Sequence, residues 1–196
     1  MKPISLISGS LAPLPRANVD TDQIMPKKYL KRVERTGYGQ FVFAEWREAD
    51  PNFVLNLPQY RSARLLVTGP NFGGGSSREH APWGLQDWGF EAIVAPSFAD
   101  IFFNNCTKIG LLPVVLTDKE VAWLMELGEA EPEAVVEVNL PEQKVTTEGF
   151  EAEFSIDSYT RWRLEIGLDD IELTLRHTGD IDEFEVSRPR HLPSLT

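Results

Sequence analysis

The residues with the richest chemistry in this chain lie in a glycine-rich segment at positions 69–80, with the sequence GPNFGGGSSREH. An apolar run precedes it and predicts a buried strand, and residues 79–88 follow with the pattern of a helix. Glycine lets a backbone approach a ligand closely, and the unpaired N–H groups of a first helical turn attract anions. The segment therefore predicts an anion site at the start of a helix, centred on Ser76, Ser77 and Arg78.

The two serines have a structural and a chemical interpretation. Ser76 with Glu79 three positions later fits a capping box, which allows the helix to begin at Ser76. In the chemical interpretation one serine is the reactive group, because fixed N–H groups and Arg78 would stabilise its anion. The segment lacks the Gly-x-Ser-x-Gly pattern of hydrolases and the Gly-Lys-Ser/Thr ending of a P-loop. A serine hydrolase and a nucleotide-binding protein are therefore weak alternatives.

Neighbouring charged residues leave several roles open. An arginine in a first helical turn opposes the helix dipole, so Arg78 is expected to have another purpose, such as a carboxylate clamp. His80 is expected to support the turn through hydrogen bonds rather than to carry protons. Asp20 and Asp22 either form a turn, or one of them orients a cation or the serine in the site.

Composition excludes several classes of function. The chain has 196 residues and a net charge of −11, which argues against general binding to nucleic acid or anionic membranes. The single cysteine, Cys106, rules out an internal disulfide and a metal site built only from thiolates of this chain. Cys106 is expected to be buried and inert, and Asn104 and Asn105 beside it to lie in a turn that supports the glycine-rich segment. No apolar run approaches the ~18 residues of a membrane span, so a cytoplasmic protein is expected.

The remaining patterns predict an α/β protein. Strands alternate with helices in the middle of the chain and favour a parallel sheet: strands at 65–68, 92–95 and 111–116, helices at 79–88 and 98–104. Other segments read as an edge strand (4–14), a polar surface connection (48–62), a helix (119–128), an antiparallel meander (135–156) and a helical tail from 157 onward that frays at its end.

Residues 69–116 resemble the swivel domain of the aconitase superfamily. The similarity lies in GGGSSREH, then AIVAPSFADIF, then NNC and GLLPV. NVDTDQI at 18–24, YLKRV at 29–33 and LDDIELTLRH at 168–177 are similar to the small-subunit family of bacterial 3-isopropylmalate dehydratases. This resemblance implies a three-layer β/β/α swivel domain over residues 1–156, with a C-terminal helical extension at 157–196 packed on the same domain.

The resemblance also implies an activity and a partner. The family's hydro-lyases interconvert 2-isopropylmalate and 3-isopropylmalate through 2-isopropylmaleate in leucine biosynthesis, by loss and return of water. They work only with a large subunit, which carries a [4Fe–4S] cluster, and the small subunit binds no cofactor. By the motif match, Ser76 resembles the base that moves the carbon-bound proton, and Ser77 and Arg78 resemble the residues that bind a substrate carboxylate.

The basic loop at 27–35 resembles the part of the family that tells an isopropyl group from a third carboxylate. Leu30 is then the apolar contact, with Lys31 beside it. Supporting roles fall to five further residues: Asp22, Gly74, Gly75, Glu79 and His80. Two alternatives stay open, a related hydro-lyase for citraconate-like or homoaconitate-like acids and a non-catalytic anion-binding module. The module predicts that Ser76→Ala preserves all function.

Overall fold

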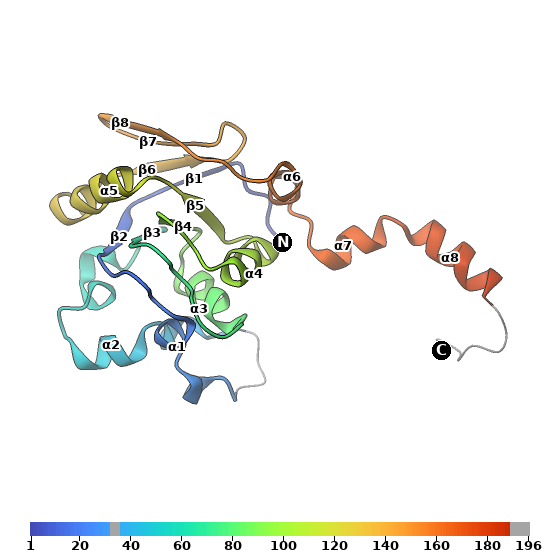
Figure 1. The fold of residues 1–196 in the computed structure, drawn as a ribbon, viewed down its shortest axis with the longest axis horizontal. Coiled ribbons are helices and arrows are strands. Elements are labelled where there is room, and N and C mark those ends of the chain that lie inside the picture. The colour runs from blue at the N-terminus through green and yellow to red at the C-terminus, as the bar shows by residue number, and fades with distance from the viewer. Residues whose placement is uncertain (32–35, 189–196) are drawn as a thin grey trace.

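The structure is a computed structural model that describes residues 1–31 and 36–188. It contains two four-stranded sheets, one parallel and one antiparallel, and most of the helices lie on the side of the parallel sheet that faces away from the antiparallel sheet (Figure 1). The parallel sheet has the order β2 (Leu11–Leu14), β3 (Leu65–Thr68), β4 (Ala92–Ala95), β5 (Leu112–Val115). The antiparallel sheet has the order β1 (Leu6–Gly9), β6 (Val136–Asn139), β7 (Lys144–Thr147), β8 (Phe150–Glu153).

Both faces of the parallel sheet are buried, and each face has its own hydrophobic core. Leu65 and Val67 of β3 face the antiparallel sheet, while Leu66 between them faces the opposite helices. Burial on both faces explains why these strands are continuous apolar runs without alternating polar residues. The three layers are thus an antiparallel sheet, a parallel sheet and a helical layer, which confirms the predicted β/β/α fold class.

The helical layer follows from the predicted alternation of strands and helices. Sequential strands pair in parallel, with Leu65 opposite Ala92 and Ala92 opposite Leu112. The helices of this face are α1 (Thr21–Ile24), α2 (Ala44–Ala49), α3 (His80–Trp88) and α4 (Asp100–Ile109), whereas α5 (Asp118–Ala130) packs on the other face. Gly89, at φ 122°, ends α3 as predicted.

Predictions about three segments need correction. Residues 4–14 lie at sheet edges, as predicted, but they form two strands of different sheets instead of one, because the chain crosses from one sheet to the other between Gly9 and Leu11. The polar connection at 48–62 buries Phe53, Leu55 and Tyr60 beneath two 3₁₀ turns, Val54–Asn56 and Pro58–Tyr60.

Residues 104–106 lie within helix α4 rather than in a turn, since the helix continues to Ile109 and ends at Gly110 with φ 81°. Their amides therefore have positions fixed by a helix.

The C-terminal part is helical, with α6 (Ser158–Ile166), α7 (Asp170–Leu175) and α8 (Thr178–Ser187). Asp157 caps α6, accepting a hydrogen bond from the Thr160 backbone at 2.8 Å. Leu164 anchors α6 in the core, and Figure 1 shows α7 and α8 extending away from the sheets. The predicted division at residues 156 and 157 stays a prediction. Predictions for the end of the tail, at 189–196, lie outside the described residues.

Candidate active site

The glycine-rich turn that follows β3 is held between the N-terminal segment and α4. Gly73 and Gly75 have φ angles of 82° and 88°, in the left-handed region that favours glycine. A Cβ on Gly73 would lie 2.1 Å from Cγ of Phe102 in α4, so the turn packs directly on that ring. Thr21 N donates to the Gly74 carbonyl at 2.9 Å and fastens the other side of the turn.

Ser76 does not begin helix α3, so the predicted capping box with Glu79 is wrong. Helix α3 starts at His80, and Glu79 precedes it in helical conformation without a side-chain capping bond. The Ser76 carbonyl instead accepts a hydrogen bond from Oγ1 of the buried Thr21 at 2.8 Å. This bond ties Ser76 to the N-terminal segment, and residues 77–79 connect it to the helix.

Ser76 and Arg78 line one cavity of about 220 Å³. The start of α4 forms the facing wall, so a hydroxyl, a guanidinium and a helix N-terminus share a single space. The lining residues are Thr21, Gly73, Gly75, Ser76, Arg78, Ala99, Asp100, Ile101, Phe102 and Asn105.

The helix terminus at this cavity belongs to α4, not to α3 as predicted. Ala99 precedes the helix and makes no side-chain capping bond, so the cavity borders a first turn that no side chain caps. Such a terminus carries a partial positive charge that favours anions. The sequence does indicate an uncapped helix start here, because Ala99 stands where Ser, Thr, Asp or Asn is usual. It does not indicate that this helix start lies beside Ser76.

Arg78 is fixed in place by an ion pair with Asp22 in the first turn of α1. The Arg78 side chain is only 12% exposed, whereas the Asp22 side chain is 55% exposed. Asp20 has a different part, since its carboxylate caps α1 by accepting a hydrogen bond from Gln23 N at 2.7 Å. The guanidinium has five N–H donors, which leaves some for an anion in the cavity.

Other residues predicted for the site do not line the cavity. Ser77 and Glu79 are exposed on the connection to α3. His80 packs against the rings of Tyr38 and Trp83, with ring centroids 5.1 and 4.9 Å away. Burial lowers the pKa of His80 below its usual 6.5, so the imidazole is neutral at pH 7. Its packing stabilises the start of α3.

The structure describes only part of the basic loop at 27–35. Leu30 follows a 3₁₀ turn at Lys27–Tyr29 and packs, half-buried, on the core beneath the helices. Lys31 is exposed, and neither residue lines the cavity. The basic residues predicted at 32 and 35 lie outside the described part of the chain.

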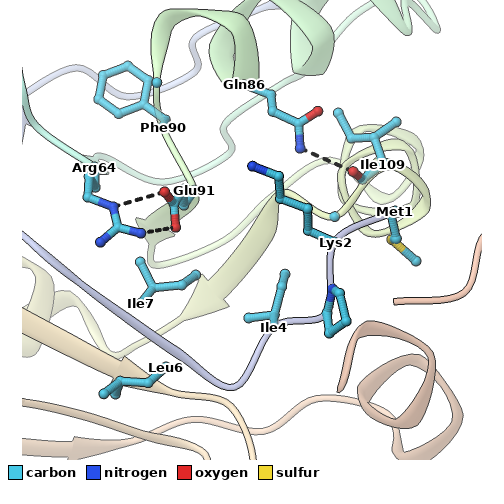
Figure 2. A pocket seen from close by; sticks show the side chains of 13 residues that line it. Met1, Lys2, Ile4, Leu6, Ile7, Arg64, Gln86, Phe90, Glu91 and Ile109 are labelled. Carbon is cyan, nitrogen blue, oxygen red and sulfur yellow. Dashed lines mark hydrogen bonds and ion pairs between the residues drawn. The ribbon is translucent and has the colours of Figure 1, made fainter. Parts of the chain in front are cut away.

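A second cavity of about 520 Å³ lies between the N-terminal segment and the ends of α3 and α4 (Figure 2). Figure 2 shows the Arg64 guanidinium against both carboxylate oxygens of Glu91, with Lys2 as a further cation that lines the cavity. Gly89 and Gly110, which end the two helices, also line it, so carbonyl ends face this space and disfavour anions. The smaller cavity at Ser76 is thus the better match to anion chemistry.

The described residues offer no ligand set for a metal. Across 1–31 and 36–188, no group of three or more His, Cys, Asp or Glu side chains could hold a metal ion. Cys106 is fully buried, as predicted, and burial raises its pKa well above the ordinary value. In the same part of the chain, no helix has the length and apolar character needed to cross a membrane.

Comparisons with known proteins agree with this architecture. The family described as Aconitase C-terminal domain matches residues 1–119, and the family LeuD_N matches residues 123–158. A protein of Rubrobacter xylanophilus is 55% identical over 195 residues, covering 100% of both chains. One of Halalkalibacterium halodurans is 54% identical, covering 96% of this chain and 100% of its own. Both are named 3-isopropylmalate dehydratase small subunit.

A solved structure is also similar. The crystal structure of 3-isopropylmalate dehydratase from Methanocaldococcus jannaschii superposes with a TM-score of 0.68 at 26% identity, covering 91% of this chain and 99% of that one. Sequence and fold thus confirm the predicted resemblance along almost the whole chain. The chain belongs to the family of 3-isopropylmalate dehydratase small subunits, whose N-terminal part is an aconitase C-terminal domain.

Proposed function

We propose that this chain is one half of an isopropylmalate hydro-lyase and that Ser76 is its base. The observation that carries the proposal is the single cavity that Ser76 and Arg78 line beside the start of α4. The names of the relatives supply 3-isopropylmalate as substrate and loss of water as reaction, and the family resemblance adds 2-isopropylmalate, formed when water returns.

The proton chemistry follows from what surrounds the hydroxyl. Serine accepts a proton from carbon only as its alkoxide, which forms when the hydroxyl has lost its own proton and the remaining negative charge is stabilised. The Arg78 guanidinium and the positive end of α4 border the same cavity and lower the energy of that anion. The oxyanion then removes the carbon-bound proton during dehydration, holds it as the hydroxyl proton, and returns it to carbon during rehydration.

Arg78 would bind a substrate carboxylate through the N–H groups that Asp22 leaves free. A planar guanidinium matches a carboxylate with two parallel hydrogen bonds, and the ion pair with Asp22 orients it beforehand. We assign Ser77 to the same carboxylate, and Leu30 and Lys31 to the substrate side group. The likeness to the family supports these three assignments.

A partner subunit is needed because the site is open. Ser76 is exposed in this chain, whereas proton abstraction by an alkoxide requires a site closed to water. Ile101, on the cavity wall, is 53% exposed and offers an apolar contact to a covering surface. We propose that the large subunit provides this cover. The likeness to the family supports a [4Fe–4S] cluster in that subunit, which would act as Lewis acid on the leaving hydroxyl.

Reconstitution with the large subunit tests the proposal. We expect no turnover by the isolated chain, and a complex in which Ser76→Ala lowers kcat by about 10²–10⁴-fold, the usual contribution of a general base. Ser62→Ala is the matched control, because Ser62 is exposed and does not line the cavity. Full activity of Ser76→Ala in an intact complex would support a non-catalytic anion-binding module instead.

A panel of acids identifies the substrate. Citraconate-like and homoaconitate-like acids should be poor substrates of the reconstituted complex compared with 2-isopropylmalate. A preference for either of these acids would assign the chain to a related hydro-lyase.

A further inference from the structure

Helix α4 carries a buried amide that has no partner. The Asn105 side chain belongs to a residue only 9% exposed, and its Nδ2 is buried with no hydrogen-bond partner among the described residues. Buried amide donors are nearly always paired, because an unpaired one loses its bonds to water and gains nothing in return. An unpaired buried amide therefore does not stabilise the fold, and its presence points to another role.

Asn105 is one of the residues that line the Ser76 cavity. Side chains of a helix lean toward its N-terminus, which places Asn105 over the turn that contains Ile101 and Phe102. All three residues line the cavity with Ser76 and Arg78. The same helix begins there without a side-chain cap, so its first turn and residue Asn105 border one space.

We propose that Asn105 binds the substrate: its side-chain amide turns toward the cavity, and the buried Nδ2 donates a hydrogen bond to a carboxylate oxygen of the dicarboxylate that Arg78 also holds. The inference rests on the proposed function and adds a residue to it. The uncapped first turn of α4 adds its partial positive charge to this subsite. Asp100 is the one carboxylate among the residues that line the cavity, and it is exposed, so water screens its repulsion.

A substrate-binding role and a structural role predict opposite effects on stability. If Asn105 serves the substrate, Asn105→Leu removes an unpaired donor, and the unfolding temperature of the free chain stays constant or rises. Asn56 is the matched control, since its Nδ2 donates to the carbonyls of Arg47 and Asp50 at 2.8 and 2.9 Å. Asn56 also accepts a bond from Arg47 Nε at 3.2 Å, so Asn56→Leu should lower the unfolding temperature.

The experiment compares the two leucine variants in complex with the large subunit. Measurements are KM and kcat for 2-isopropylmalate, the inhibition constant of maleate, and the unfolding temperature of each free chain. We expect Asn105→Leu to lower kcat/KM about 10- to 100-fold, the range of a lost hydrogen bond to a charged group, with most of the loss in KM. The inhibition constant of maleate should rise in parallel, and Asn56→Leu should leave both constants unchanged.

The outcomes separate this inference from the proposed function. Unchanged KM and maleate inhibition for Asn105→Leu, in a preparation where Ser76→Ala loses turnover, would overturn the role of Asn105 alone. Retained turnover of Ser76→Ala would overturn the proposed function itself. If Asn105→Leu does not fold, Asn105→Asp keeps the volume and replaces the donor with a carboxylate. That variant must then raise KM at neutral pH, and an unchanged KM would equally overturn the inference.

Discussion

Replacing Gly73 with alanine should destabilise the chain more than the same replacement at the other glycines of the glycine-rich turn. The added Cβ would lie 2.1 Å from Cγ and 2.5 Å from Cβ of Phe102, and no side chain tolerates such distances. Phe102 cannot move away cheaply, because it is 2% exposed and packs edge-on against Phe72 with ring centroids 5.3 Å apart. The substitution therefore forces a shift of α4 or of the turn.

The magnitude follows from two terms. The φ angle of 82° costs an alanine about 1–2 kcal/mol, and overpacking a buried site adds about 1–3 kcal/mol. The expected loss for Gly73→Ala is thus about 2–5 kcal/mol of unfolding free energy, a large share of the ~5–15 kcal/mol of a typical domain.

Gly75→Ala is the matched control for this variant. Its φ of 88° is equally unfavourable, but its Cβ would meet no atom closer than 3.6 Å. Only the conformational cost of about 1–2 kcal/mol remains. Because both variants stiffen the unfolded chain alike, the difference between them isolates the packing of Gly73 on Phe102.

The assay is urea unfolding of the free chain, followed by tryptophan fluorescence and fitted by linear extrapolation. In the reconstituted enzyme, Gly73→Ala should also lower kcat/KM, since it separates α4 from Ser76. Equal losses of stability for the two alanine variants would refute the reasoning, because they would show that the turn does not pack closely on α4.

Three further predictions concern single residues. Thr21→Val removes the 2.8 Å hydrogen bond to the Ser76 carbonyl, so the unfolding free energy should fall by about 0.5–1.5 kcal/mol. Because that bond positions Ser76, kcat should also fall, by up to about 100-fold. Loss of stability without loss of kcat would contradict this positioning role. Burial lowers the pKa of His80 below 6.5, so the unfolded chain binds a proton more readily and the unfolding free energy should fall as pH drops below 6.5. The unfolding free energy of His80→Gln should depend less steeply on pH in this range. Equal pH dependence for the two proteins would be inconsistent with this cause. Burial raises the pKa of Cys106, so iodoacetamide should label it far more slowly in buffer than in urea, and equal rates would argue against its burial.

Local patterns in the sequence were sufficient for much of the fold. The strands at 65–68 and 92–95 were predictable because burial on both faces makes them continuous apolar runs. Gly89 and Asp157 are of the residue types that favour helix ends, and such signals can be read from the sequence because capping depends on residues only a few positions apart. The meander at 135–156 was predicted from alternation, which one solvent-facing side of a sheet imposes.

Segments whose structure depends on distant partners were predicted wrongly. The run at 4–14 divides into β1 and β2 because β1 pairs with residues 136–139 and β2 with residues 65–68, far apart in the chain. Ser76 and Glu79 have the spacing of a capping box, but the bond from Thr21 draws the Ser76 carbonyl elsewhere. A competing tertiary contact overrode a weak local preference in each case.

The sequence by itself determined which chemical groups the site has: a serine, an arginine and glycines at positions that need positive φ. Only the tertiary structure decided how they meet. It pairs Arg78 with Asp22, 56 positions away, and brings the start of α4 and residue Asn105 to the cavity that Ser76 lines. The physical reason is range, since periodicity and capping act within one or two helical turns, whereas packing against both faces of a sheet joins segments without regard to their separation in the chain.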